Sequence, residues 1–149
     1  MNQFYRVLEK IKETLEADID VNTVTYGDIT QIDLNKQTIY PLSHVMVNNV
    51  TSSEAVLAFN ITVLSMDLVD VTKDEDDSFE RSNEQDVLNT QLAVQNRLIQ
   101  KMRIGSIYVD KYQIEEDVNI EFFTDRFENE VAGCAATFNI NVENDVNVC

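Results

Sequence analysis

The chain has few of the residues that bend or cross-link a polypeptide. Its 149 residues include three glycines, one proline, two cysteines and no tryptophan. Turns must therefore depend on asparagine, aspartate and serine, which are plentiful. Cys134 and Cys149 form neither a disulfide framework nor the paired spacing of a zinc site. Cys134 lies in an apolar run, which is typical of a small core residue.

Long apolar runs and positive charge are also scarce. No stretch approaches the ~18 apolar residues of a membrane span. No basic segment followed by an apolar one opens the chain, so we expect no signal peptide and synthesis in the cytoplasm. The 27 acidic residues outnumber the 11 basic ones, and the net charge is −16. This balance disfavours non-specific binding to nucleic acid and to anionic membranes. Solubility is its simplest explanation, but an acidic surface also lets DNA pass without adhering.

Two segments have the apolar spacing of amphipathic helices. The first is predicted from Gln3 to Ala17, and the second follows a capping box formed by Ser82 and Gln85 and stops before Gly105. The apolar stripe of the first contains Phe4, Val7, Leu8, Ile11 and Leu15. That of the second contains Val87, Leu88, Leu92, Val94, Leu98, Ile99 and Met102.

The segments between and after these helices are rich in β-forming residues. Strands are predicted at Val21–Tyr26, His44–Val50, Leu57–Val63, Ile107–Tyr112, Val118–Phe123 and Cys134–Val142. The stretch from Ile29 to Tyr40 alternates only weakly. The apolar phase changes after Val63, which predicts a bulge or strong bend near Leu64–Ser65. The pattern indicates a single α+β domain over residues 1–149, a mainly antiparallel sheet with two helices packed on it.

An acidic run separates the third of these strands from the second helix. It begins Lys73-Asp74-Glu75-Asp76-Asp77, and it lacks the spacing and the distal glutamate of an EF-hand loop. We therefore expect a mobile acidic loop at about residues 71–82 and no metal site. A loop of this length between ordered elements often carries function, so Lys73, Asp74, Glu75, Asp76 and Asp77 are candidate interface residues.

Catalytic residues are not apparent. His44 has no serine or cysteine partner at a recognisable spacing, and Asp67 and Asp70 have no nucleophile, base or metal ligand beside them. We therefore predict no enzyme, no catalytic residue and no cofactor. A different pattern, Asp125-Arg126-Phe127-Glu128, places an arginine between two carboxylates inside a connection between strands. It favours equally a local ion-pair corner and a subunit contact.

The order of elements resembles a known family. The succession helix, strands, long loop, helix, strands at this length is similar to that of the tail terminators of long-tailed bacteriophages. These are also called tail-to-head joining or tail completion proteins. The resemblance covers nearly the whole chain and includes the stretches Tyr26–Asp33, Ile39–His44, Ser65–Asp70, Asn89–Val94, Asp125–Asn129 with Ala132–Gly133, and Asn144–Cys149.

The resemblance implies a structural virion protein, assembled in the host cytoplasm. Its copies would form a ring, typically of six, that caps the tail tube and joins it to neck or head-completion proteins while DNA passes without specific binding. Such a ring needs heterologous contacts, which strand edges could supply. Two alternatives remain: another neck component or tail tube subunit, and a cytoplasmic ligand-binding module or small enzyme using the region of Asp67 and Asp70.

Overall fold

The computed structural model describes residues 3–33, 36–69, 84–103, 113–114, 117–124 and 131–144. In chain order the elements are α1 (Gln3–Glu16), β1 (Thr23–Tyr26), the 3-10 helices η1 (Ile29–Gln31) and η2 (Gln37–Ile39), β2 (Leu42–Ser52), β3 (Val56–Leu68), α2 (Glu84–Arg103), β4 (Gln113–Ile114), β5 (Ile120–Thr124) and β6 (Val131–Glu143).

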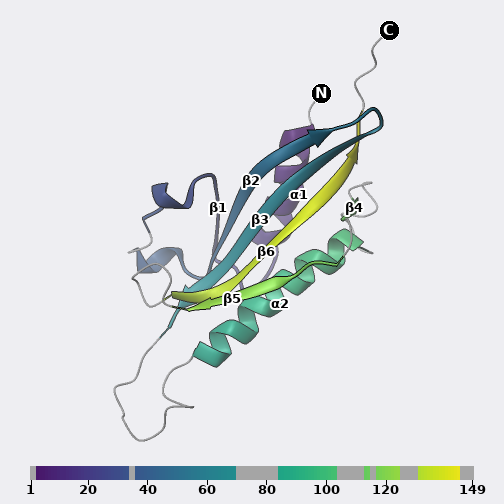
Figure 1. Cartoon of the computed structure of the whole chain (residues 1–149). Helices are drawn as coiled ribbons and strands as arrows, with labels where there is room; N and C mark the ends of the chain where they lie inside the picture. The colour runs from purple at the N-terminus through teal and green to yellow at the C-terminus, as the bar shows by residue number, and fades with distance from the viewer. Residues whose placement is uncertain are drawn as a thin grey trace, which may run out of the picture.

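The described strands form one sheet with the order β1-β2-β3-β6-β4. Strand β5 also pairs with β6, on the same side as β4 but nearer the start of β6. Only β1 runs parallel to its neighbour, and the other pairs are antiparallel. Both helices lie on one face of the sheet, behind it in Figure 1. The structure therefore confirms the α+β prediction, a mostly antiparallel mixed sheet with two helices packed on it.

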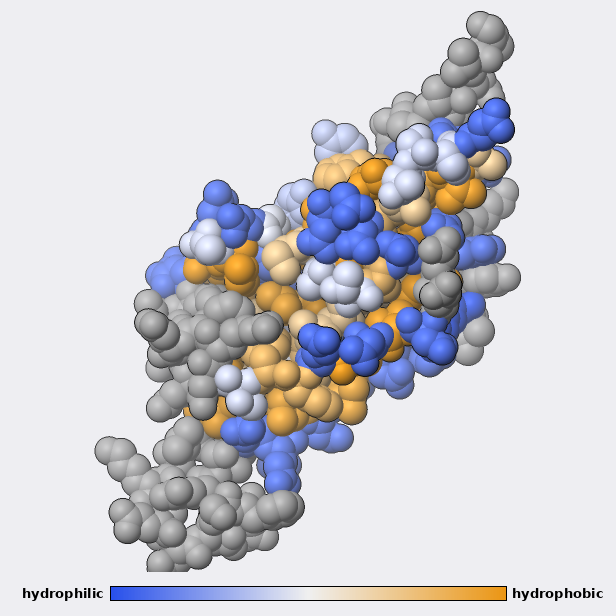
Figure 2. All heavy atoms as spheres, viewed as in Figure 1, coloured by the Kyte–Doolittle hydropathy of each residue, from blue (hydrophilic) through white to orange (hydrophobic). Residues whose placement is uncertain are grey.

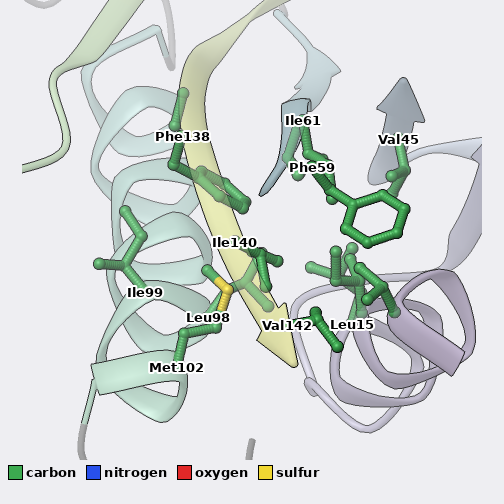
Figure 3. Packing of buried hydrophobic residues seen from close by; sticks show 14 of the residues in the cluster. Leu15, Val45, Phe59, Ile61, Leu98, Ile99, Met102, Phe138, Ile140 and Val142 are labelled. Carbon is green, nitrogen blue, oxygen red and sulfur yellow. The ribbon is translucent and has the colours of Figure 1, made fainter. Parts of the chain in front are cut away.

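The core lies between this sheet and the two helices. Alternate residues of β3 and β6, among them Phe59, Ile61 and Ile140, point toward the helices and are almost fully buried. Leu15 from α1 and Leu98 from α2 meet them from the other side, as Figure 3 shows. Each fully buried side chain of this kind contributes about 1.5–3 kcal/mol.

The first helix agrees closely with its predicted range, but its apolar stripe is narrower than expected. Val7, Ile11 and Leu15 are buried, whereas Phe4 is 38% exposed and the neighbouring Gln3 is buried. The prediction for Phe4 was wrong because this end of α1 lies near the hairpin end of the sheet. There the Phe4 ring packs against the buried Phe59 ring, with 6.4 Å between the centroids, and against the exposed Tyr5 ring, with 5.9 Å between the centroids.

The predicted bulge near Leu64–Ser65 is also wrong. Strand β3 pairs with β6 in continuous register from Val56 to Leu68, and its pairing with β2 is regular at those two residues. The apolar residues change face because this end of the sheet is covered on both sides. On the side away from the helices a second cluster contains Tyr40, Leu42, Leu64, Met66, Phe123 and Val131. The only register shift between β2 and β3 lies in β2, between Val47 and Asn49.

The weakly alternating stretch before β2 contains the two 3-10 helices and no strand among its described residues. Asp28 caps η1 because its carboxylate accepts the Thr30 N–H at 3.0 Å, and this bond lowers the pKa of Asp28. The stretch ends in a cis peptide bond between Tyr40 and Pro41, directly before β2. Pro41 has no N–H to donate to a strand ladder, and it lies directly before the first residue of β2.

Two polar side chains attach α2 to the rest of the fold. Gln95, fully buried, donates from Nε2 to the Val63 carbonyl at 2.8 Å. Arg97 makes a bidentate pair with Asp18, at 2.7 and 2.8 Å, and contacts Asp20 at 2.8 Å. Burial alone would raise the pKa of Asp18, but the hydrogen bonds and the charge of Arg97 hold it below its ordinary value. These contacts fix α2 against both the sheet and the turn after α1.

Candidate functional site

Most of the site residues predicted from sequence lie outside the described residues. This holds for Lys73, Asp74, Glu75, Asp76 and Asp77 in the acidic loop, and for Asp125, Arg126, Phe127 and Glu128 before β6. Asp70 and the predicted strand Ile107–Tyr112 also lie outside them. The assignments of these residues therefore stay predictions.

The single histidine is buried and fully hydrogen-bonded. His44 Nε2 lies 2.7 Å from the Gly27 carbonyl oxygen, and Nδ1 lies 2.7 Å from the Thr25 hydroxyl. Because a carbonyl only accepts, Nε2 carries the proton and Nδ1 accepts from Thr25. The ring thus ties β2 to β1 and to the turn that follows β1. This geometry indicates a structural role for His44.

His44 makes the stability of the protein depend on pH. Desolvation by burial lowers its pKa below 6.5, against the opposing effects of the Gly27 hydrogen bond and the Asp28 charge. The unfolded chain therefore takes up a proton at His44 at a higher pH than the folded chain does. The free energy of unfolding should fall as pH decreases through 6.5, with a slope of up to about 1.4 kcal/mol per pH unit.

Urea unfolding followed by circular dichroism between pH 7.5 and 5.0 measures this slope. The His44→Gln variant should be less stable at pH 7.5 but nearly independent of pH over that range, because glutamine does not titrate. The lowered pKa of Asp18 acts below its ordinary value of 3.8, outside this window, and Asp67, whose pKa is raised, is present in both proteins, so its effect cancels in the comparison. An equal slope in wild type and variant would contradict the assignment to His44.

Asp67, a candidate acid in the alternative enzyme hypothesis, is half-buried near the end of β3. Its carboxylate accepts the N–H of Leu68 at 2.8 Å. Desolvation by burial raises its pKa, against this hydrogen bond. Its charge in turn adds to the effect of burial in raising the pKa of Tyr40. Asp67 therefore lies at the edge of the second apolar cluster, and its contacts indicate a structural role.

Metal ligation and thiol chemistry find no support in the part of the chain that the structure describes. No group of three histidine, cysteine or carboxylate side chains is close enough there to hold a metal ion. Cys134 is buried, and desolvation raises the pKa of its thiol to about 11, which leaves almost no reactive thiolate at neutral pH. Neither described helix is long and apolar enough to cross a membrane.

The sheet itself is nearly free of charge in a strongly acidic chain. Strands β1, β2, β3 and β6 contain only two charged residues, Asp67 and Glu143, near or at the ends of their strands. The acidic surplus therefore lies outside these strands. An uncharged surface on a protein with a net charge of −16 is the kind of surface through which copies of like charge approach one another.

The face of the sheet away from the helices presents a hydrogen-bonded row of amides and hydroxyls. Asn48 donates to Asn60 at 2.8 Å and to Thr62 at 2.8 Å, and Asn60 donates to Asn139 at 2.9 Å. The Thr62 and Thr137 hydroxyls lie 2.9 Å apart. In Figure 2, which shows this face, hydrophilic side chains gather over the middle of the sheet with hydrophobic ones around them. The row joins β2, β3 and β6 by side-chain contacts as well as by backbone pairing.

Two surface hollows meet at Tyr26, where β1 ends. One, of about 490 Å³, lies between α1 and β1 and is lined by Tyr5, Leu8, Glu9, Lys12, Val24, Thr25, Tyr26 and Val45. The other, of about 420 Å³, lies where β2 continues past β1 and is lined by Tyr26, Gly27, Asp28, Met46, Val47 and Asn48. Sequence analysis missed this site, because it depends on one strand being shorter than its neighbour.

Comparison of the chain with protein-family models and with curated proteins found no match.

Proposed function

We propose that the chain is a structural virion protein of a tailed bacteriophage, a tail terminator whose copies form a ring between tail tube and neck. The observation that carries this proposal is the uncharged sheet of the acidic chain. Like-charged copies repel one another, so contacts through a nearly uncharged surface carry the least electrostatic cost. The acidic remainder of the surface suits a passage through which DNA moves without adhering.

The proposal also agrees with the chemistry of the described residues. His44 and Asp67 are hydrogen-bonded within the fold, which indicates structural rather than catalytic roles for both. An uncharged face crossed by mutually bonded amides is a rigid surface suited to contact with other proteins. The partners would be other copies of the chain, the tail tube protein and the neck or head-completion proteins.

Mass in solution tests the proposal. Light scattering or native mass spectrometry of the purified chain, over a range of protein and salt concentrations, should give one closed assembly of a few copies. Added tail tubes should promote that assembly if the chain alone is monomeric. Salt should favour it, because salt screens the repulsion between acidic copies.

The other outcomes identify the alternatives. Open-ended polymers would indicate a tail tube subunit. A stable monomer that ignores tail tubes would refute the virion ring. In that case, a shift of melting temperature with small molecules would favour a ligand-binding module that uses the hollow beside Tyr5.

A further inference from the structure

One border of the sheet contains an empty strand position. Strand β1 ends at Tyr26, opposite Val45, and the chain turns away at Gly27, whose φ is +110°. Strand β2 continues to Ser52. Within the described part of the chain, no strand lies against residues 46–52 of β2 on this side. The hollow of about 420 Å³ lies at the start of this position.

The backbone of β2 presents hydrogen-bonding groups to this position. The Val45 carbonyl accepts an N–H from the turn after β1, so the backbone of Val47, two residues on, faces the same side beyond the end of β1. The Ser53 N–H donates to the Val56 carbonyl in the hairpin, so the backbone of Ser53 faces β3 and that of Ser52 faces away from it. An unpaired edge of this kind is a template for strand addition from another chain.

The hollow of about 490 Å³ meets this position at Tyr26, on the helix side of the sheet. Two of its lining residues are exposed tyrosines, Tyr5 (73%) and Tyr26 (54%), and a third is Glu9. Lys12 also lines it, but its ammonium group lies 3.8 Å from the carboxylate of Glu16. Glu9 has no ion-pair partner among the described residues. Exposed aromatic rings beside an unpaired carboxylate suit a cationic side chain.

We propose that the two hollows hold an extended segment of another protein, which adds a strand along residues 46–52 of β2 and places a lysine or arginine beside Glu9. Side chains of an added strand alternate between the two faces of the sheet. Those on the helix side would therefore enter the hollow between α1 and β1, where the two tyrosine rings lie. This inference does not depend on the proposed ring.

Charge argues for a basic segment from a different protein. The chain has a net charge of −16, Glu9 lines one hollow and Asp28 lines the other. Residues 46–52 carry no charge, so nothing along the strand edge itself repels a cation. The described strands contain no lysine or arginine, so those of a second copy could not supply the basic side chain.

A labelled peptide tests strand addition. The probe is a peptide of alternating lysine and valine, as long as residues 46–52, followed by fluorescence anisotropy in about 0.15 M salt. We expect it to bind the purified chain, and we expect a peptide of alternating glutamate and valine not to bind. Two further peptides carry N-methyl groups on alternate backbone amides. One should bind at least about tenfold more weakly and the other about as well as the probe, because only one edge of an added strand faces β2.

Variants of the protein test the hollow. Glu9→Gln and Tyr5→Ala should each weaken binding of the lysine–valine peptide about two- to fivefold. Glu13→Gln is the matched control, because it removes the same charge from an exposed residue of α1 outside both hollows, and it should leave binding unchanged.

Three results would overturn the proposal. They are no binding of the lysine–valine peptide, equal binding of the two methylated peptides, and equal losses for Glu9→Gln and Glu13→Gln. The last two would show that only the general charge of the chain attracts the peptide. None of them changes the mass expected in solution, so the proposed ring is tested separately.

Discussion

Gly133→Ala should destabilise the fold by more than about 3 kcal/mol, the largest effect we expect from one added methyl group. A Cβ at this position would lie 1.9 Å from the Ser65 carbonyl oxygen and 2.8 Å from the Met66 Cα. Both neighbours are backbone atoms of β3, which pairs with β6 at this point, while β5 pairs with β6 on its other side. No side-chain rotation relieves the clash, so the strands must separate.

Urea unfolding measures this loss, with circular dichroism or tyrosine fluorescence as the signal because the chain has no tryptophan. Gly27→Ala is the matched comparison. At φ +110° and with nothing within 4 Å of the new Cβ, it adds backbone strain but no clash, which costs about 1–2 kcal/mol. Equal losses in the two variants would mean that the tight approach of β6 to β3 is absent in solution.

Phe59→Ala should cost about 3–5 kcal/mol, the range for removing a large buried aromatic side chain. Phe59 is 2% exposed, lies in the core between the sheet and α1, and contacts the Phe4 ring. Its loss leaves a cavity that backbone pairing with β2 and β6 prevents from collapsing.

The control is Val50→Ala, directly opposite Phe59 on β2 but 44% exposed, which should change stability by at most about 0.5 kcal/mol. Phe59→Leu should recover much of the loss, since it restores part of the buried volume. A loss below about 1 kcal/mol for Phe59→Ala would contradict the packing of α1 on the sheet.

The strongly periodic segments were predictable from sequence. The range of α1 and the positions of β3, β5 and β6 follow the spacing of their apolar residues within a few positions. Where periodicity failed, burial on both faces explains the error. Leu64 and Met66 break the alternation of apolar and polar residues, which indicates a bulge only if one face of the strand is exposed. Here a second apolar cluster covers the face away from the helices, so both faces are buried.

The candidate site was not predictable, because it depends on which strand borders which. Tyr5 and Tyr26 are ordinary helix and strand residues in the sequence, and only the packing of α1 beside β1 places them on one hollow. Tyr26 lines both hollows because β1 ends there, and the chain turns at Gly27, whose φ is positive. The exposure of Phe4 depends on where α1 ends over the hairpin, which local spacing does not encode.

The closeness of α1 to the last strand has a consequence for the timing of folding. Gln3 Nε2 donates to the Glu143 carbonyl at 3.4 Å, across 140 positions in the sequence, and β6 completes the core on which α1 rests. Contacts so distant in sequence form slowly, and during synthesis they wait until β6 has left the ribosome. An incomplete nascent chain therefore lacks the finished sheet and helix surface, so the proposed assembly of copies would have to wait until translation has passed β6.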